Sequence, residues 1–390
     1  MINFVALRYL FVRLYKVPQR YGITHEDFDQ DPTLVGKRRE LIHDAASKLF
    51  SAKLIRYEEN SRSYATTDVG RVASKFYVDW QTAELFSKSI RKNMGDQEII
   101  KLFGQASEFD QLKVREDEQQ ELMKLRKDKN VCSFQPLGGT DNNYGKVGIL
   151  LQAYISRAHI DSFSLIADTN YIVQNASRVL RAMFEITMTR VVQASEMAER
   201  LLEWFKMVDR RLWDTAHPLR AFCHPPTISA KGKVGYSSLK QEGGVLKERI
   251  VQKLEDSGFW PDRLYEMTHS EIKAVVGDPG SATAVMKYNK RVPWVELTQK
   301  VQPITASIMR VTATIKPDFD WSDRWSGPSE PFFLWVENPE NHDILHTESF
   351  QIQKQASQVA FNVSFCIPFC EPRPPQYILS VVSERWVGCK

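Results

Sequence analysis

Three features that would each point to a class of protein are absent from this sequence. The 390 residues contain no run of 18 consecutive apolar residues, so no membrane-spanning helix is expected. Lysine and arginine number 52 against 48 acidic residues. The resulting net charge of +4 is too small to indicate nucleic-acid binding by the whole chain, and any basic site must be local. The five cysteines are odd in number and scattered, which argues against a disulfide framework and favours a reducing intracellular compartment.

What is present is an ordinary globular composition, with 43% hydrophobic and 26% charged residues. The length predicts two to four domains, because single cores rarely grow beyond about 250–300 residues. The opening MINFVALRYLFVRLYKV is not interpreted as a signal peptide, since Arg8 and Arg13 interrupt its apolar run and no small-residue cleavage site follows. Its apolar residues recur at helical spacing and predict a core helix over about 4–16.

Residues 1–78 are expected to form a small winged-helix-like domain. After the first helix, Asp31-Pro32 provides an N-cap and a first helical residue for a second helix that runs to about Lys53. The segment LIRYEENSRSYATT has two short β-like runs around a polar turn, which predicts a hairpin. Asp68 is expected to cap a third helix that ends near Phe76.

Helical periodicity dominates the next two segments. Residues 79–215 predict a helical bundle, with helices near 80–92, 96–106, 114–127, 145–158, 162–172, 174–190 and 194–213. Residues 216–294 predict a helix–loop–helix unit around Asp278-Pro279-Gly280. Within it, the Gly-, Ser- and Lys-rich stretch 228–245 has no apolar periodicity and is expected to be a mobile insertion loop.

Residues 295–390 change character. Alternating runs such as SIMRVTATIKP, FFLWVEN and QVAFNVSFCIP, separated by proline and glycine, predict at least five strands and a β-sandwich. The expected fold class is therefore a multidomain chain, mainly α, with a C-terminal sandwich.

None of the candidate catalytic motifs in this sequence has the residues that its chemistry requires. GGTDNNYGK has the wrong glycine spacing for a phosphate loop and Val147 in place of the metal-binding hydroxyl. The acidic pair Asp117-Glu118 lies in a highly charged segment and is interpreted as a solvated helix face. His342 and His346 lack the further ligands that zinc requires. Cys366 and Cys370 are interpreted as small core residues. We therefore expect no catalysis and no metal site in this chain.

One helix carries a candidate binding site. In IVQNASRVLRAMFEITMTR, an apolar face is expected to pack inward, formed by Ala176, Val179, Leu180, Met183 and Phe184. Gln174, Arg178, Arg181 and Glu185 follow each other at i, i+4, i+7 and i+11 as one polar stripe, with Asn175 at its edge. Arginine on a mostly buried helix needs a solvent channel or an anionic partner, and it can hold the phosphates of a single strand. Pairing inside the protein, such as Arg181 with Glu185, is the structural alternative.

Several long segments, in the same order, resemble the Sec63 homology region of Ski2-like helicases over nearly the whole chain. They include RYLFVRLYKVPQRYGI, TDVGRVASKFYV, GILLQAYISR, QNASRVLRAMFEI and PPQYILSVVSERWVG. The resemblance implies a winged helix, a helical bundle, a helix–loop–helix domain and an immunoglobulin-like or fibronectin-like sandwich. It also implies that QNASRVLRAMFEI is a ratchet helix, so that Gln174, Asn175, Arg178 and Arg181 contact a translocating single strand.

The same resemblance implies partners outside this chain: single-stranded RNA or DNA, two ATPase domains that bind ATP and Mg²⁺, and a second helicase cassette. It implies an intracellular location, in the nucleus or the cytoplasm. Compared with the family, the ATPase domains are missing upstream and the sandwich stops after Trp386. We therefore expect a fragment that does not hydrolyse ATP alone and has an incomplete sandwich with an exposed β edge.

Two alternatives stay open at the level of the sequence. The chain could serve as a protein-interaction scaffold of a helicase-containing complex, without touching nucleic acid. A translocation subunit of the endoplasmic reticulum is a weaker alternative, because it requires membrane spans and a His-Pro-Asp triplet. Here His217-Pro218 is followed by Leu219, and His224-Pro225 by Pro226. The sequence does not distinguish RNA from DNA as the substrate, nor does it indicate a pathway.

Overall fold

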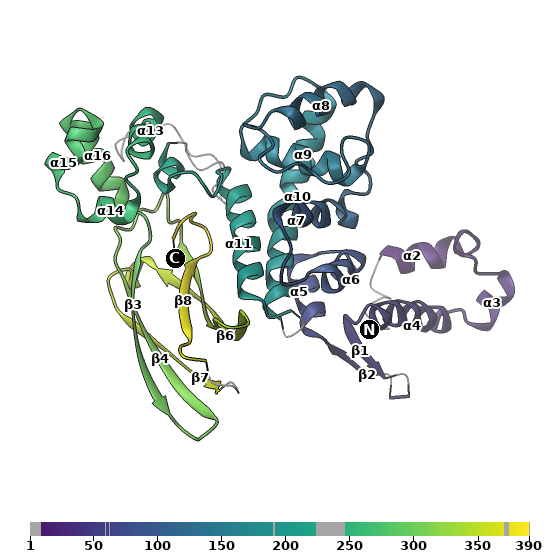
Figure 1. The fold of residues 1–390 in the computed structure, drawn as a ribbon. Coiled ribbons are helices and arrows are strands. Elements are labelled where there is room, and N and C mark those ends of the chain that lie inside the picture. The colour runs from purple at the N-terminus through teal and green to yellow at the C-terminus, as the bar shows by residue number, and fades with distance from the viewer. Residues whose placement is uncertain are drawn as a thin grey trace. The chain divides into compact units, whose positions relative to one another are not determined.

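A computed structural model describes residues 9–58, 60–61, 63–189, 192–223, 246–369 and 374–389. The chain divides into two compact units, Met1–Lys88 and Ser89–Lys390. Figure 1 shows the expected fold class, with helices through the first two thirds of the chain and antiparallel strands at the end. None of the described helices is long and apolar enough to cross a membrane. The predicted insertion 228–245 lies outside the described residues.

The first unit follows the predicted order of helices around a hairpin. Its elements are α2 (Tyr9–Lys16), η1 (Pro18–Tyr21), α3 (His25–Gln30), α4 (Val35–Ser51), β1 (Ile55–Glu58), β2 (Ser63–Thr66), α5 (Asp68–Phe76) and α6 (Trp80–Ser89). The expected cap of α5 was wrong by one residue. Thr67, not Asp68, has extended backbone, and its hydroxyl accepts from the Gly70 amide at 3.1 Å. A side chain at Gly70 would collide with the Leu54 carbonyl, so this close packing requires glycine.

The helical bundle begins the second unit. It contains α7 (Asp96–Gly104), η2 (Ser107–Phe109), η3 (Glu116–Glu118), α8 (Gln119–Lys127), α9 (Asn143–Ile155), α10 (Phe163–Met188), α11 (Ser195–Arg210) and η4 (Pro218–Phe222). The two helices expected at 162–172 and 174–190 are one continuous helix, α10. Helix α11 packs along α10, and α9 packs against α10 and α7 (Figure 1).

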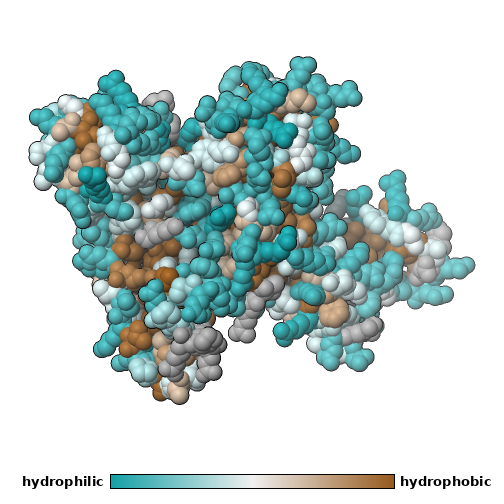
Figure 2. All heavy atoms as spheres, viewed as in Figure 1, coloured by the Kyte–Doolittle hydropathy of each residue, from teal (hydrophilic) through white to brown (hydrophobic). Residues whose placement is uncertain are grey.

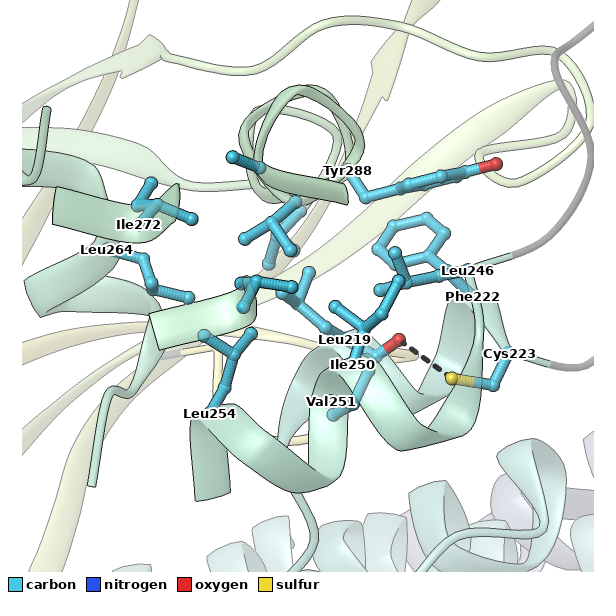
Figure 3. Close-up of a cluster of buried hydrophobic side chains, with 14 of the residues drawn as sticks. Leu219, Phe222, Cys223, Leu246, Ile250, Val251, Leu254, Leu264, Ile272 and Tyr288 are labelled. Atoms are coloured by element: carbon cyan, nitrogen blue, oxygen red, sulfur yellow. Dashed lines mark hydrogen bonds between the residues drawn. The ribbon is translucent and has the colours of Figure 1, made fainter. Parts of the chain in front are cut away.

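A small helical domain follows, formed by α13 (Glu248–Asp256), α14 (Pro261–Glu266), α15 (His269–Val276) and α16 (Pro279–Asn289). Asp278 caps α16, since its carboxylate accepts from the Ser281 amide at 2.7 Å and Pro279 occupies the first helical turn. Figure 3 shows how Ile250, Val251 and Leu254 of α13 meet side chains from the neighbouring helices and from Phe222 in one buried hydrophobic cluster. That cluster also contains Trp325 and Trp386 of the C-terminal domain, so it fastens the two domains together.

The C-terminal domain has two three-stranded antiparallel sheets, ordered β3-β4-β7 and β6-β5-β8. Its strands are β3 (Val295–Pro303), β4 (Ile308–Pro317), β5 (Ser329–Asn338), β6 (Asp343–Gln353), β7 (Phe361–Pro368) and β8 (Ile378–Ser383). Alternate residues of β4 are buried with apolar residues of β5, β7 and β8 in one core, which confirms the sandwich-like unit. Strand β3 lies at a sheet edge and is exposed from Thr298 onward.

Candidate nucleic-acid interface on helix α10

Helix α10 is 26 residues long, about 39 Å at 1.5 Å per residue, and its inward face is apolar. The Glu121 carboxylate accepts from the Asp161 and Ser162 amides, at 2.6 and 3.0 Å, just before the first turn. The predicted inward residues are all buried: Ala176, Val179, Leu180, Met183 and Phe184. The polar stripe predicted from their spacing therefore lies along one side of a single rigid helix.

Three of the four predicted contact residues keep accessible surface. Gln174 is exposed, and Asn175 is half-buried. Arg178 donates from Nε and Nη2 to the Asn175 side-chain oxygen, at 3.1 and 2.7 Å, and its Nη1 lies 3.8 Å from a Glu108 carboxylate oxygen. A third of the Arg178 side chain remains exposed, at 33%. The structure brings these three polar side chains together at the surface.

Arg181 is placed differently. Its side chain is only 15% exposed, and its Nη1 donates to the carboxylate of Glu384, in the turn after β8. The guanidinium carbon lies 5.4 Å from the ring centroid of Phe205 and 5.3 Å from that of Phe333. Burial lowers the pKa of Arg181, although Glu185, with a carboxylate oxygen 3.7 Å from Nε, acts in the opposite direction. Arg181 thus joins the bundle to the sandwich, and its contact with nucleic acid stays a prediction.

A buried ionic cluster supports the N-terminal half of α10, and sequence patterns did not reveal it. Glu118 was expected on a solvated face, but its side chain is fully buried. Its carboxylate accepts from Lys146 Nζ of α9 at 2.5 Å and from Ser164 Oγ of α10 at 2.6 Å. Lys146 is also fully buried and lies 2.6 Å from a carboxylate oxygen of Asp168. The expected solvated face was right for Asp117, which is exposed, and wrong for Glu118, because nothing near Glu118 in the sequence shows that Lys146 packs over it.

The same cluster shows which groups bind the lysine that follows the glycine-rich loop, Lys146. Lys146, the residue that would bind phosphate in a phosphate loop, donates to Glu118 and to the Lys113 carbonyl instead. Burial by itself raises the pKa of Glu118, but hydrogen bonds from Lys146 and Ser164 and the charge of Lys146 outweigh it, so the net pKa is lowered. Lys146 therefore fixes α9 against the residues around Glu118.

The histidines considered as zinc ligands, and Cys366, belong to the C-terminal domain. His342 lies in the turn after β5, with Nε2 3.4 Å from Glu196, and the His346 ring stacks on Phe365 at a centroid distance of 4.2 Å. The described residues contain no group of three or more His, Cys, Asp or Glu that could hold a metal ion. Cys366, expected in the core, is exposed because it falls on the outward register of β7, and Cys370 lies outside the described residues.

A bundle with one long helix, a small helical domain and a β-sandwich, in this order, define a multidomain module of the type expected from the sequence. A family model described as the Sec63 Brl domain matches residues 66–390, so the chain belongs to the Sec63 family.

Curated relatives match along the whole chain. It is 38% identical over 392 residues to activating signal cointegrator 1 complex subunit 3 of Bos taurus and 37% identical to that of Homo sapiens. It is 33% identical over 389 residues to the U5 small nuclear ribonucleoprotein 200 kDa helicase of Homo sapiens. In each case the match covers 100% of this chain but only 17% of the relative, so the chain spans about a sixth of their length.

Proposed function

We propose that this chain is a non-catalytic accessory region of an ATP-dependent helicase, which guides a single strand of RNA or DNA along helix α10. The observation that carries the proposal is the row of Gln174, Asn175 and Arg178, which stays accessible on a helix whose other side is buried. A guanidinium and two amides can hold phosphates and base edges through weak contacts, which suits a strand that must move.

The proposal places the other parts of the reaction outside this chain. ATP and Mg²⁺ would bind to ATPase domains elsewhere in the helicase, and a second cassette would be a further partner. One relative is named as a helicase and another as a cointegrator complex subunit, which supports helicase domains and cointegrator-complex subunits as partners. We place this activity inside the cell, in the nucleus or the cytoplasm.

Replacing Arg178 by glutamine tests the role of α10. We expect the affinity for a fluorescent single-stranded RNA or DNA to fall about fivefold at low salt, because one phosphate contact is lost. The slope of log affinity against log salt should decrease in magnitude by about one. Fluorescence anisotropy of the full chain measures both quantities.

Lys300→Gln, an exposed lysine on β3, is the matched control because it removes the same charge from the sandwich. It should leave affinity and salt slope nearly unchanged. Equal losses in the two variants would show that the measurement reports only the net charge of the chain, and no loss in Arg178→Gln would remove the proposed contact.

A protein-interaction scaffold is the second candidate function. Apolar side chains around the turn of the β3–β4 hairpin are exposed, with Val301 at 52%, Ile304 at 49% and Ile308 at 40%. In the view of Figure 2 the surface is mostly hydrophilic, and hydrophobic residues gather over the sandwich. A scaffold would bind single strands negligibly at every salt concentration, whereas the first candidate predicts steep salt dependence.

A further inference from the structure

A cavity of about 470 Å³ lies where the helical bundle meets the small helical domain. The ends of α9 and α11 form one side, with Arg157 and Arg211. The other side comes from η4, α13 and the residue before α14, with Arg220, Glu255 and Trp260. This volume falls within the range of small-molecule pockets, roughly 300–1,000 Å³. The cavity is separate from the polar row on α10, and a ligand in it would not depend on a strand-guiding role for that helix.

Two guanidinium groups face this cavity because two helices end beside it. Arg157 and Arg211 follow the last turns of α9 and α11, and both have left-handed backbone, with φ of 57° and 52°. Arg211 is held in place, since its Nε donates to the Tyr154 carbonyl at 2.7 Å and its guanidinium lies over the Tyr154 ring. Arg157 is exposed. The part of Arg157 that is shielded from water still lowers its pKa, and the neighbouring charge of Arg211 lowers it further, so these two cations repel each other.

The carboxylates at the cavity compensate this positive charge only in part. Glu255 is already paired, because Arg220 donates to its two oxygens at 2.7 and 2.6 Å. Glu248, which also lines the cavity, is exposed on the first turn of α13. Its charge raises the pKa of Arg157, but this effect is smaller than that of Arg211. A dianion between Arg157 and Arg211 would relieve their repulsion and accept several charge-assisted hydrogen bonds.

An aromatic surface lies beside these cations. One face of Trp260 stacks on His217, with ring centroids 5.4 Å apart and planes 12° apart. The residue is nevertheless 43% exposed, which is unusual for an indole in a folded domain. A planar ring could stack on the accessible part of Trp260 at little entropic cost, because the His217 contact already holds the indole in place.

We propose that this cavity binds a nucleotide phosphomonoester, with the phosphate on Arg157 and Arg211 and the base against Trp260. Two guanidiniums match the double negative charge of a terminal phosphate better than the single charge of a phosphodiester. The ligand has two sources, a free mononucleotide or the phosphorylated end of a nucleic-acid strand.

Calorimetric titration of the full chain with AMP, adenosine and a pair of oligonucleotides that differ only in a 5′-phosphate distinguishes these sources. We expect AMP to bind at least tenfold more tightly than adenosine. If the strand end is the ligand, the 5′-phosphorylated oligonucleotide will bind more tightly than its unphosphorylated partner. Arg157→Gln should weaken binding of the phosphorylated ligand at least fivefold, and Trp260→Ala should weaken it while Trp260→Phe largely preserves it.

Arg157 is exposed, so its replacement is not expected to unfold the chain, and Lys300→Gln again controls for net charge. The proposal is overturned if neither AMP nor the phosphorylated oligonucleotide binds, or if Arg157→Gln binds as tightly as the native chain. Because Arg178 lies outside the cavity, Arg178→Gln should leave AMP binding unchanged. Failure of the α10 proposal and failure of this one are therefore separable.

Discussion

Replacing Lys146 by methionine is expected to destabilise the helical bundle by about 3–5 kcal/mol. Lys146 and Glu118 are both fully buried, and Lys146 lies within 2.6 Å of carboxylate oxygens of both Glu118 and Asp168. Methionine fills a similar volume but leaves these two carboxylates with the half-exposed Arg115, 2.5 Å from Glu118 and 3.8 Å from Asp168, as the neighbouring cation. Hydrogen exchange of peptides from α9 and α10 measures the loss where it arises, because exchange reports local as well as global opening.

A double variant that replaces Glu118 as well as Lys146 is the matched control. In Lys146→Met combined with Glu118→Gln, the buried negative charge falls by one, so we expect the double variant to regain part of the lost stability. Additive losses would show that the two residues act independently and would contradict the ionic cluster. A loss below about 1 kcal/mol in the single variant would mean that Lys146 is solvated in solution.

The cluster also predicts how the stability of the bundle depends on pH. The pKa of Glu118 is lowered from its ordinary 4.5, so its ionised form stabilises the folded state. That contribution is complete above about pH 4.5 and is lost as the pH falls through the lower pKa of the folded state. Lys146→Met removes the hydrogen bond and the charge of Lys146, which are among the causes of this lowering, while the hydrogen bonds from Ser164 and the Arg115 amide remain. Its stability should therefore fall less steeply than that of the native chain below pH 4.5, as measured by urea titrations.

Helix faces and strand faces were predictable from the sequence, because they depend on the spacing of residues that are close together in the chain. The inward face of α10 was predictable because Ala176, Val179 and Met183 recur at helical spacing. The sandwich was predictable because its strands alternate, and alternation determines which face is buried. The break expected at residue 173, between the helices at 162–172 and 174–190, was wrong, because α10 runs without interruption from Phe163 to Met188.

Contacts between distant segments were not predictable. Arg181 and Glu384 are separated by 203 residues, and the sequence indicated Glu185 or a neighbouring helix, but not the sandwich, as the source of a partner for Arg181. The cavity with Arg157, Arg211 and Trp260 likewise forms only when the bundle and the small helical domain pack together. The four predicted contact residues do share one helix, but tertiary packing decides which of them are accessible.

Arg181 is more deeply buried than Arg178, and this leads to the second large expected effect. Arg181→Glu should destabilise the contact between the bundle and the sandwich by roughly 3 kcal/mol, since it places a third carboxylate beside Glu185 and Glu384 in a site where the side chain is 15% exposed. It also removes the cation from between Phe205 and Phe333. Urea unfolding, together with hydrogen exchange of peptides from β5 and β8, measures the effect.

Arg178→Glu is the matched control, because it makes the same charge change on the same helix at a side chain that is 33% exposed. We expect it to cost less stability than Arg181→Glu, because the new carboxylate at position 178 can turn away from Glu108 toward solvent. Exchanging the charges in Arg181→Glu with Glu384→Arg should restore part of the loss. If Arg181→Glu is as stable as Arg178→Glu, the Arg181–Glu384 pair does not hold the domains together.

The two arginines should therefore be separated in any test of helicase activity. A combined Arg178 and Arg181 variant would lose unwinding either because the strand is no longer held or because the sandwich no longer packs correctly on the bundle. Arg178→Glu alone, in a helicase that contains this chain with its ATPase domains, is expected to reduce unwinding more than ATP hydrolysis, since the proposal puts the strand contact on α10 and the ATPase sites outside this chain. Unchanged unwinding in that variant would contradict a guiding role for α10, whatever Arg181→Glu does.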